Sequence, residues 1–294
     1  MKKPIYLLLC AATAVLCTSC QKDELKSVSS AKEQIVLSLA DGSIDMSVAT
    51  KATEISAMPS SINLARTTGT WKSETSANAS SSFNVSSNKI ATGWYQTATA
   101  TAYNYYVSNA AITFAAGGST IVADNATDVI AGCTQGASNS STPSVTLDHV
   151  FARTATLTCN TQSGYEISNV SWKIKSESGT GTKGTYNIAT KVWSSVTALS
   201  EQAFTSSSDL YLIPGSYTVS VTYTLKKGAY SQTFTKSGTV TLVAGKKNSI
   251  SCTATGGSAT EIQLGVTLTS WGTEEKTLTF SGIKNNQNNF EIKQ

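Results

Sequence analysis

Residues 217–225 read YTVSVTYTL, which is the clearest pattern in the chain. Apolar and aromatic side chains alternate with threonine and serine, so in an extended chain every apolar residue points to the same side. Valine, tyrosine and threonine also favour strands. Pro214 and Gly215, which come shortly before, are typical of a turn. We therefore predict a β-strand with one buried face.

The same two-residue period recurs through the C-terminal half of the chain. It is found at residues 145–151, 170–174, 240–242, 250–252 and 262–268. Turn residues separate these segments, and none has the period of an amphipathic helix. Only 14% of all residues are charged and four are proline. These features predict an all-β protein built of sandwiches.

The N-terminal half opens with a pattern typical of a hairpin. Six apolar residues alternate with polar ones on either side of an Asp-Gly turn at 41–42, namely Ile35, Leu37, Leu39, Ile44, Met46 and Val48. A two-residue turn places all six on one face. Because an isolated hairpin is only marginally stable, we expect it to dock on a larger sheet.

The length of 294 residues suits two domains of ordinary size. The clearest strand of the first half is expected at 94–107, and residues 132–142, rich in serine, glycine and asparagine, are typical of a linker. The predicted parts are a signal peptide at 1–19, a tether at 20–34, an N-terminal β-sandwich domain at 35–142, a C-terminal β-sandwich domain at 143–280 and a polar tail at 281–294.

The start of the chain has the features of a cleaved leader. Two lysines precede an apolar run at 5–16, and Thr18 and Ser19 place small side chains before Cys20. As a helix this run is about 18 Å long, shorter than the roughly 30 Å hydrocarbon core of a bilayer. The arrangement resembles the lipobox of bacterial lipoproteins, in which the cysteine is acylated and becomes the first mature residue. We expect lipidation at Cys20.

Four polar residues follow that cysteine, namely Gln21, Lys22, Asp23 and Glu24. They resemble the export signal that carries lipoproteins of the Bacteroidetes to the outer face of the outer membrane. This predicts a lipid-anchored protein exposed at the surface of the cell outer membrane. The alternative is a solvated tether without signal function.

The sequence contains none of the motifs expected of common enzymes. It has one histidine, His149, and the neighbouring Asp148 points to the other face of the predicted strand. There is no nucleophile elbow, phosphate loop or zinc-ligand spacing. We expect a structural histidine, no metal, no cofactor and no enzymatic activity. The balance of 22 basic against 18 acidic residues gives no footprint for nucleic acid.

Three cysteines follow Cys20, namely Cys133, Cys159 and Cys252. An odd number cannot all pair within one chain. A bridge between Cys159 and Cys252 is one interpretation, because both end predicted strands. Buried free thiols are the other.

Five segments taken in order carry a resemblance to a known family. They are DVIA at 128–131, VTLDHVFA at 145–152, LIPG at 212–215, VTLVAGKK at 240–247 and VTLTSW at 266–271. Together with the lipobox they resemble the markers of fimbrillin-like proteins, which are surface lipoproteins and type V pilus subunits of the Bacteroidetes. The resemblance implies two tandem transthyretin-like β-sandwich domains. It also implies a structural or accessory fimbrial subunit in adhesion, with other fimbrial subunits and a host or bacterial surface ligand as partners.

The resemblance further implies a route of assembly. In the pilins, a surface protease cuts after an arginine near the mature N-terminus, which removes a strand and opens a groove for the donor strand of a neighbour. Here Lys51 stands at the matching place, and Arg66 is the substitute further on. The expected donor strand contains Ile262, Leu264, Val266 and Leu268. The alternative is that this strand stays in its own domain, as in an anchor or tip subunit.

A second class of function is a surface glycan-binding lipoprotein of a polysaccharide-uptake system. Trp71, Trp94 and Trp193 would then stack on sugar rings, although aromatic residues in β-proteins are more often core residues. An exposed coplanar pair of aromatics would favour glycan binding. A removable strand over an apolar groove would favour assembly.

Overall fold

All regular structure in the described residues is β-strand, which confirms the predicted all-β class. The two tandem transthyretin-like domains stay a prediction. The computed structural model describes residues 33–42, 55, 57–68, 75–96, 102–114, 117–138, 142–161, 163–206, 208, 210–255, 261–270 and 275–276. Nowhere in these ranges is there a helix with the length and apolarity that crossing a bilayer requires.

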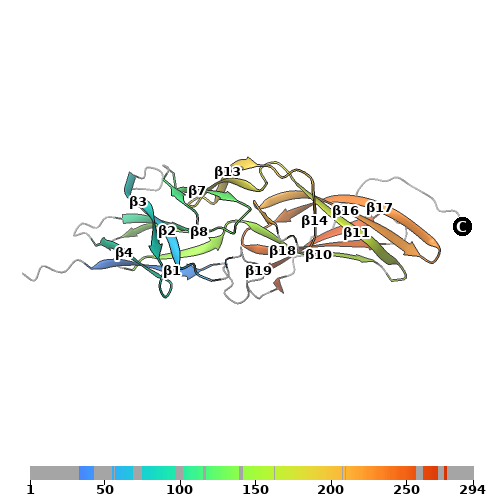
Figure 1. The fold of residues 1–294 in the computed structure, drawn as a ribbon, viewed down its shortest axis with the longest axis horizontal. Coiled ribbons are helices and arrows are strands. Elements are labelled where there is room, and N and C mark those ends of the chain that lie inside the picture. The colour runs from blue at the N-terminus through green and yellow to red at the C-terminus, as the bar shows by residue number, and fades with distance from the viewer. Residues whose placement is uncertain are drawn as a thin grey trace, which may run out of the picture. The chain divides into compact units, whose positions relative to one another are not determined.

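The strands of the described residues, of which the two longest lie in the C-terminal half, run from two to thirteen residues (Figure 1). They are β1 (Gln34–Asp41), β2 (Ser61–Thr68), β3 (Thr75–Asn84), β4 (Lys89–Tyr95), β5 (Ala102–Ser108), β6 (Ile112–Thr113), β7 (Thr120–Asp124), β8 (Ile130–Ser138), β9 (Ser144–His149), β10 (Ala152–Thr161), β11 (Glu166–Ser176), β12 (Lys183–Asn187), β13 (Val192–Thr197), β14 (Gln202–Phe204), β15 (Tyr211–Leu212), β16 (Gly215–Lys227), β17 (Tyr230–Leu242), β18 (Lys246–Thr255), β19 (Glu261–Ser270) and β20 (Glu275–Lys276).

These strands form four sheets. The largest has seven strands in the order β3-β2-β5-β8-β9-β1-β4. A second has the order β13-β12-β7-β6, a third the order β15-β10-β18-β19-β20, and a fourth the order β14-β11-β16-β17. Most neighbours are antiparallel, but β1 runs parallel to β9, and β10 runs parallel to β18.

Strand β16 confirms the prediction for residues 217–225. Tyr217, Val219, Val221, Tyr223 and Leu225 are all buried. They form one cluster with side chains of β10, β11, β14, β17 and β18, so the two C-terminal sheets share a core. On the other face of the β16–β17 pair, threonine and serine hydroxyls contact each other across the strands.

The strand predicted at 94–107 is two strands, so that prediction is wrong. β4 pairs with β1, whereas β5 pairs with β2 and β8. Tyr95, at the end of β4, is 52% exposed, while Tyr103 and Tyr105 of β5 are buried. Residues 96–101 contain no glycine or proline that would mark the break. Both faces of β5 are buried, because Tyr106 on the opposite side packs into a different cluster.

The predicted linker at 132–142 is also wrong for residues 132–138, which belong to β8 and pair with β5. The positions of two of its glycines within the sheet explain why glycine is needed there. A Cβ added to Gly132 would lie 1.9 Å from the carbonyl oxygen of Thr146 in β9. Gly136 has a φ of 63° and donates its N–H to the Asn104 side chain. Close approach and a positive φ therefore explain a composition that resembles a linker.

A separate cluster contains side chains from both predicted domains. It includes Tyr106 and Ile121 from the first and Phe151, Tyr186 and Ile213 from the second. β7 pairs with β12, and β9 joins the sheet that contains β1 and β8. The division of the chain at residue 142 stays a prediction.

Candidate functional site: the groove that holds strand β1

Strand β1 has the alternation that its sequence predicts. Ile35, Leu37 and Leu39 are exposed by only 1%, 0% and 5%, whereas Val36 and Ser38 between them are half-buried. The three apolar side chains pack into one core with residues of β2, β4, β5, β8 and β9. The second half of the predicted hairpin, with Ile44, Met46 and Val48, lies outside the described residues.

The backbone of β1 is hydrogen-bonded on both sides. β9 is its parallel neighbour, from Ser38 opposite Ser144 to Asp41 opposite Leu147. β4 is its antiparallel neighbour and ends the sheet. Where the β1–β4 register shifts, the buried Thr92 hydroxyl donates to the carbonyl of Ile35 at 2.7 Å. β1 is therefore an interior strand, and its removal would expose the edges of two neighbours.

The side chains that pack against β1 are apolar, so the groove that removal of β1 would leave is apolar as well. Leu64, Ile90, Tyr105, Val145 and Leu147 are each 0–1% exposed and belong to the same core as the β1 side chains. Such a surface is costly to expose, because each side chain of this size is stabilised by about 1.5–3 kcal/mol on burial. An empty groove would favour another strand with the same alternation.

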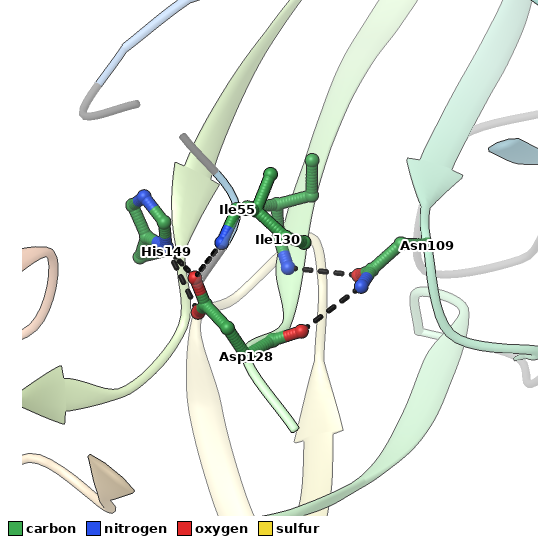
Figure 2. A network of polar contacts seen from close by, with 5 residues as sticks. All are labelled: Ile55, Asn109, Asp128, Ile130 and His149. Carbon is green, nitrogen blue, oxygen red and sulfur yellow. Dashed lines mark hydrogen bonds and ion pairs between the residues drawn. The ribbon is translucent and has the colours of Figure 1, made fainter. Parts of the chain in front are cut away.

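A buried polar network holds the chain that follows the predicted processing position (Figure 2). Asp128, in the connection between β7 and β8, is 1% exposed. One of its carboxylate oxygens accepts the backbone N–H of Ile55 at 3.0 Å, and the carboxylate also contacts Nδ1 of His149 at 2.9 Å. His149, at the end of β9, is equally buried. Ile55 lies four positions after Lys51.

Asn109 completes this network from the segment after β5. Its side-chain amide donates to the carbonyl of Asp128 at 3.0 Å and accepts the N–H of Ile130 at 2.9 Å (Figure 2). The Ser108 hydroxyl donates to the carbonyl of Ile130 at 2.8 Å. Backbone groups that would otherwise be buried without partners are thereby satisfied. Asn109 therefore holds the backbone carbonyl of Asp128, and His149 contacts the carboxylate that accepts the Ile55 N–H.

His149 is the partner of Asp128, and not of Asp148. Asp148 instead pairs with Lys191 at 3.3 Å on the surface. In the described part of the chain no group of three acidic, cysteine or histidine residues could hold a metal ion. The Asp128–His149 contact was missed because the two residues are 21 positions apart and no local pattern connects them. The network is suited to holding backbone in place.

The predicted site residues are placed as follows. Cys20, Gln21, Lys22, Asp23, Glu24 and Lys51 lie outside the described residues. Arg66 lies inside β2, between β3 and β5. Its guanidinium stacks on the rings of Trp94 at 4.2 Å and Tyr103 at 4.3 Å. Ile262, Leu264, Val266 and Leu268 lie in β19, which pairs with β18 from Glu261 to Ser270.

The tryptophans predicted to bind sugar contact other aromatic side chains. Trp94 is half-buried and lies 5.9 Å from the ring of Phe83. Trp193 lies 5.2 Å from Phe151 and 5.0 Å from Tyr186, with tilted rings in both cases. Trp71 lies outside the described residues. Tilted rings within a core cluster do not form the coplanar platform that glycan binding would require.

The chain is similar to several solved structures. A candidate cell adhesion protein of Parabacteroides distasonis has a TM-score of 0.52 and 11% identity, over 82% of this chain and 98% of that one. A candidate cell adhesion protein of Bacteroides uniformis has a TM-score of 0.48 and 12% identity, over 83% and 99%. A fimbrial assembly protein of Parabacteroides distasonis has a TM-score of 0.43 and 12% identity, over 84% and 100%.

No curated protein matches the sequence. The sequence does match the profile of one family, described as fimbrillin-like, over residues 46–271. That match spans most of the chain and includes the five segments, from residues 128–131 to residues 266–271, that carry the sequence resemblance. The chain belongs to the fimbrillin-like family.

Proposed function

We propose that this protein is a non-enzymatic lipoprotein of the cell surface that serves as a structural or accessory subunit of a fimbrium and takes part in adhesion. Membership of the fimbrillin-like family supports a surface location and assembly with other fimbrial subunits. The related structures named for cell adhesion and fimbrial assembly point the same way. The lipid on Cys20 would anchor the subunit in the outer membrane.

Subunits would join by donor-strand exchange at the β1 groove. The observation that carries this proposal is the position of β1: an interior strand whose three buried apolar side chains complete a core. A cut after Lys51 would separate β1 from the rest of the chain. The Asp128 carboxylate would still hold the chain at Ile55, so that the remaining body stays ordered around the open groove.

Lys51 suits processing better than Arg66. Arg66 is in the middle of β2, with backbone partners in two neighbouring strands. A protease binds its substrate as an extended strand through the substrate's own backbone groups, and those of β2 are bonded to β3 and β5, so cleavage there would require β2 to leave both neighbours. We therefore expect cleavage at Lys51.

The donor strand would be β19, which carries four apolar residues at alternate positions. To act as a donor it must leave β18, with which it pairs over its whole length. A subunit whose β19 stays on β18 would be an anchor or a tip that does not propagate the polymer.

The test treats purified protein with a trypsin-like protease and looks for ladders that resist SDS. Ladders are expected for the unmodified chain and not for Lys51→Ala. Leu264→Lys in the expected donor should abolish them, whereas Gln263→Lys, on the other face of the same strand, should not. Confirmed cleavage at Lys51 without oligomers would reject donor-strand exchange, and ladders that persist in Lys51→Ala would reject the processing position.

Anchoring is tested separately. Cys20→Ala should move the protein out of the membrane fraction. Replacing Lys22, Asp23 and Glu24 together with alanine should leave a lipoprotein that external protease no longer reaches. If whole-cell labelling is undiminished in the triple variant, these residues are not the export signal.

A further inference from the structure

Two cysteines face each other across the parallel pair of strands β10 and β18. Cys159 lies opposite Cys252 in the register that pairs Leu157 with Ile250 and Asn160 with Thr253. Both side chains are on the core face, because Cys252 is a member of the C-terminal core and Cys159 packs against that core. Both are reduced in the structure.

The separation of the two backbones suits a bond between these residues. Neighbouring strands lie about 4.7–4.9 Å apart. Disulfides join residues whose Cα atoms are about 4.4–6.8 Å apart and whose Cβ atoms point toward the same region. Residues in register on one face of adjacent strands satisfy both conditions. We propose that Cys159 and Cys252 are the site of a reversible disulfide, with Cys159 as the thiol that reacts first.

The two thiols differ in access. Cys252 is 0% exposed, whereas Cys159 is half-buried. Cys159 also lines a surface pocket of about 440 Å³ between β10, β11 and β14. The other lining residues are mostly apolar or small and include Leu157, Trp172 and Phe204. A small disulfide-containing molecule can therefore reach Cys159 from solvent, whereas Cys252 exposes no surface and does not line the pocket.

Their acidities differ in the same sense. The hydrogen bond from Cys252 lowers the pKa of the Cys159 thiol from its ordinary value. The same contact, together with burial, raises the pKa of Cys252. The thiolate is the nucleophile in disulfide exchange, so Cys159 is the first to attack.

The reaction needs an oxidant, which we take to be a small-molecule or protein disulfide, written RSSR. The Cys159 thiol gives its proton to water, and the thiolate attacks one sulfur of RSSR. This forms a mixed disulfide and releases RS⁻, which takes up a proton. Cys252 then loses its proton and attacks the Cys159 sulfur, which closes the bond and releases the second RS⁻. In total, two thiols are oxidised and RSSR is reduced to two RSH.

Cys133 does not compete for this site. It lies in β8 and packs against a different cluster, where its thiol contacts the carbonyl of Ile188 at 3.7 Å. The bond would join β10 to β18 whether or not β19 remains on β18, so the proposal does not depend on donor-strand exchange.

The experiment incubates reduced mature protein with oxidised glutathione, blocks remaining thiols by alkylation, and identifies the linked peptides by mass spectrometry. A Cys159–Cys252 cross-link is expected, with a rise in the unfolding temperature of several degrees that dithiothreitol reverses. Cys133→Ser should give the same product. Cys252→Ala should stop at a mixed disulfide between glutathione and Cys159.

Three outcomes would overturn the proposal. One is glutathione that remains on Cys159 of the unmodified chain. Another is a cross-link that involves Cys133. The third is alkylation of both Cys159 and Cys252 after the oxidant has been shown to react with a control thiol. These readouts use the unmodified protein, so they hold even if Cys252→Ala fails to fold.

Discussion

Leu37→Ala tests whether β1 is held mainly by its apolar face. Leu37 is fully buried and lies opposite Ile90, which is also fully buried in β4. Truncating a leucine in such a core costs about 2–5 kcal/mol, because transfer energy is lost and a cavity remains. Val36→Ala is the matched control, since Val36 is half-buried on the other face of the same strand. It should cost about 1 kcal/mol or less.

The assay is urea unfolding of the intact mature protein, followed by circular dichroism. Leu37→Ala should lower the midpoint without changing the slope, because the surface exposed on unfolding is almost unchanged. After cleavage, the equilibrium constant for binding of the β1 segment to the rest of the protein should fall by between about 30-fold and several thousandfold. This range is the cost of about 2–5 kcal/mol converted at about 1.4 kcal/mol per tenfold. Equal effects of Leu37→Ala and Val36→Ala would refute the reasoning that one face carries the binding.

Three further predictions concern stability. Asp128→Ala should cost about 1–3 kcal/mol in urea unfolding and speed hydrogen exchange at the Ile55 amide, because buried donors lose their acceptor; Lys191→Ala, which removes an exposed ion pair, should cost less than about 1 kcal/mol. Gly132→Ala should cost about 1–3 kcal/mol, seen as a lower unfolding temperature, because its Cβ would lie 1.9 Å from the Thr146 carbonyl; an unchanged temperature would contradict the close approach of β8 and β9. Burial raises the pKa of Tyr223 from 10.0 to about 12, so the unfolded chain ionises first and stability should fall as the pH rises from about 10 to about 12. Tyr223→Phe should reduce that fall, and an equal fall in the variant would assign it to other groups.

The alternation of apolar and polar residues correctly predicted the strands that have one buried face. Tyr217 to Leu225 and Ile35 to Leu39 are the clearest cases, because a two-residue period in the sequence corresponds directly to one face of a pleated strand. The prediction failed at β5, where both faces are buried. Burial of both faces removes the period, and only the positions of the neighbouring strands could have marked the ends of β5.

Glycine was the second source of error. A run rich in glycine and serine is usually a linker, yet Gly132 allows two strands to approach closely and Gly136 adopts a positive φ within β8. Both requirements arise from residues that are distant in sequence, such as Thr146 and Asn104. The candidate site also depends on contacts between residues that are distant in sequence, and local patterns do not predict these contacts. The apolar face of β1 could be predicted, whereas the Asp128–Ile55 contact joins residues 73 positions apart.

If donor-strand exchange is correct, covalent attachment of β1 explains why a cut should come before assembly. A tethered strand has an effective concentration of the order of millimolar, so a donor at about 1 μM is at a roughly thousandfold disadvantage. Cleavage removes that advantage but leaves three buried apolar side chains, together stabilised by about 5–9 kcal/mol. Release of β1 should then limit the rate of exchange.

The consequence is that weakening β1 should speed assembly. Leu37→Ala destabilises the strand that must leave and does not alter the donor, so cleaved Leu37→Ala protein should form SDS-resistant ladders faster than the unmodified chain. Val36→Ala should assemble at nearly the unmodified rate. The time course of ladder formation after complete cleavage measures this directly. An unchanged rate in Leu37→Ala would mean that departure of the donor from β18, where β19 is paired over its whole length, is the slow step.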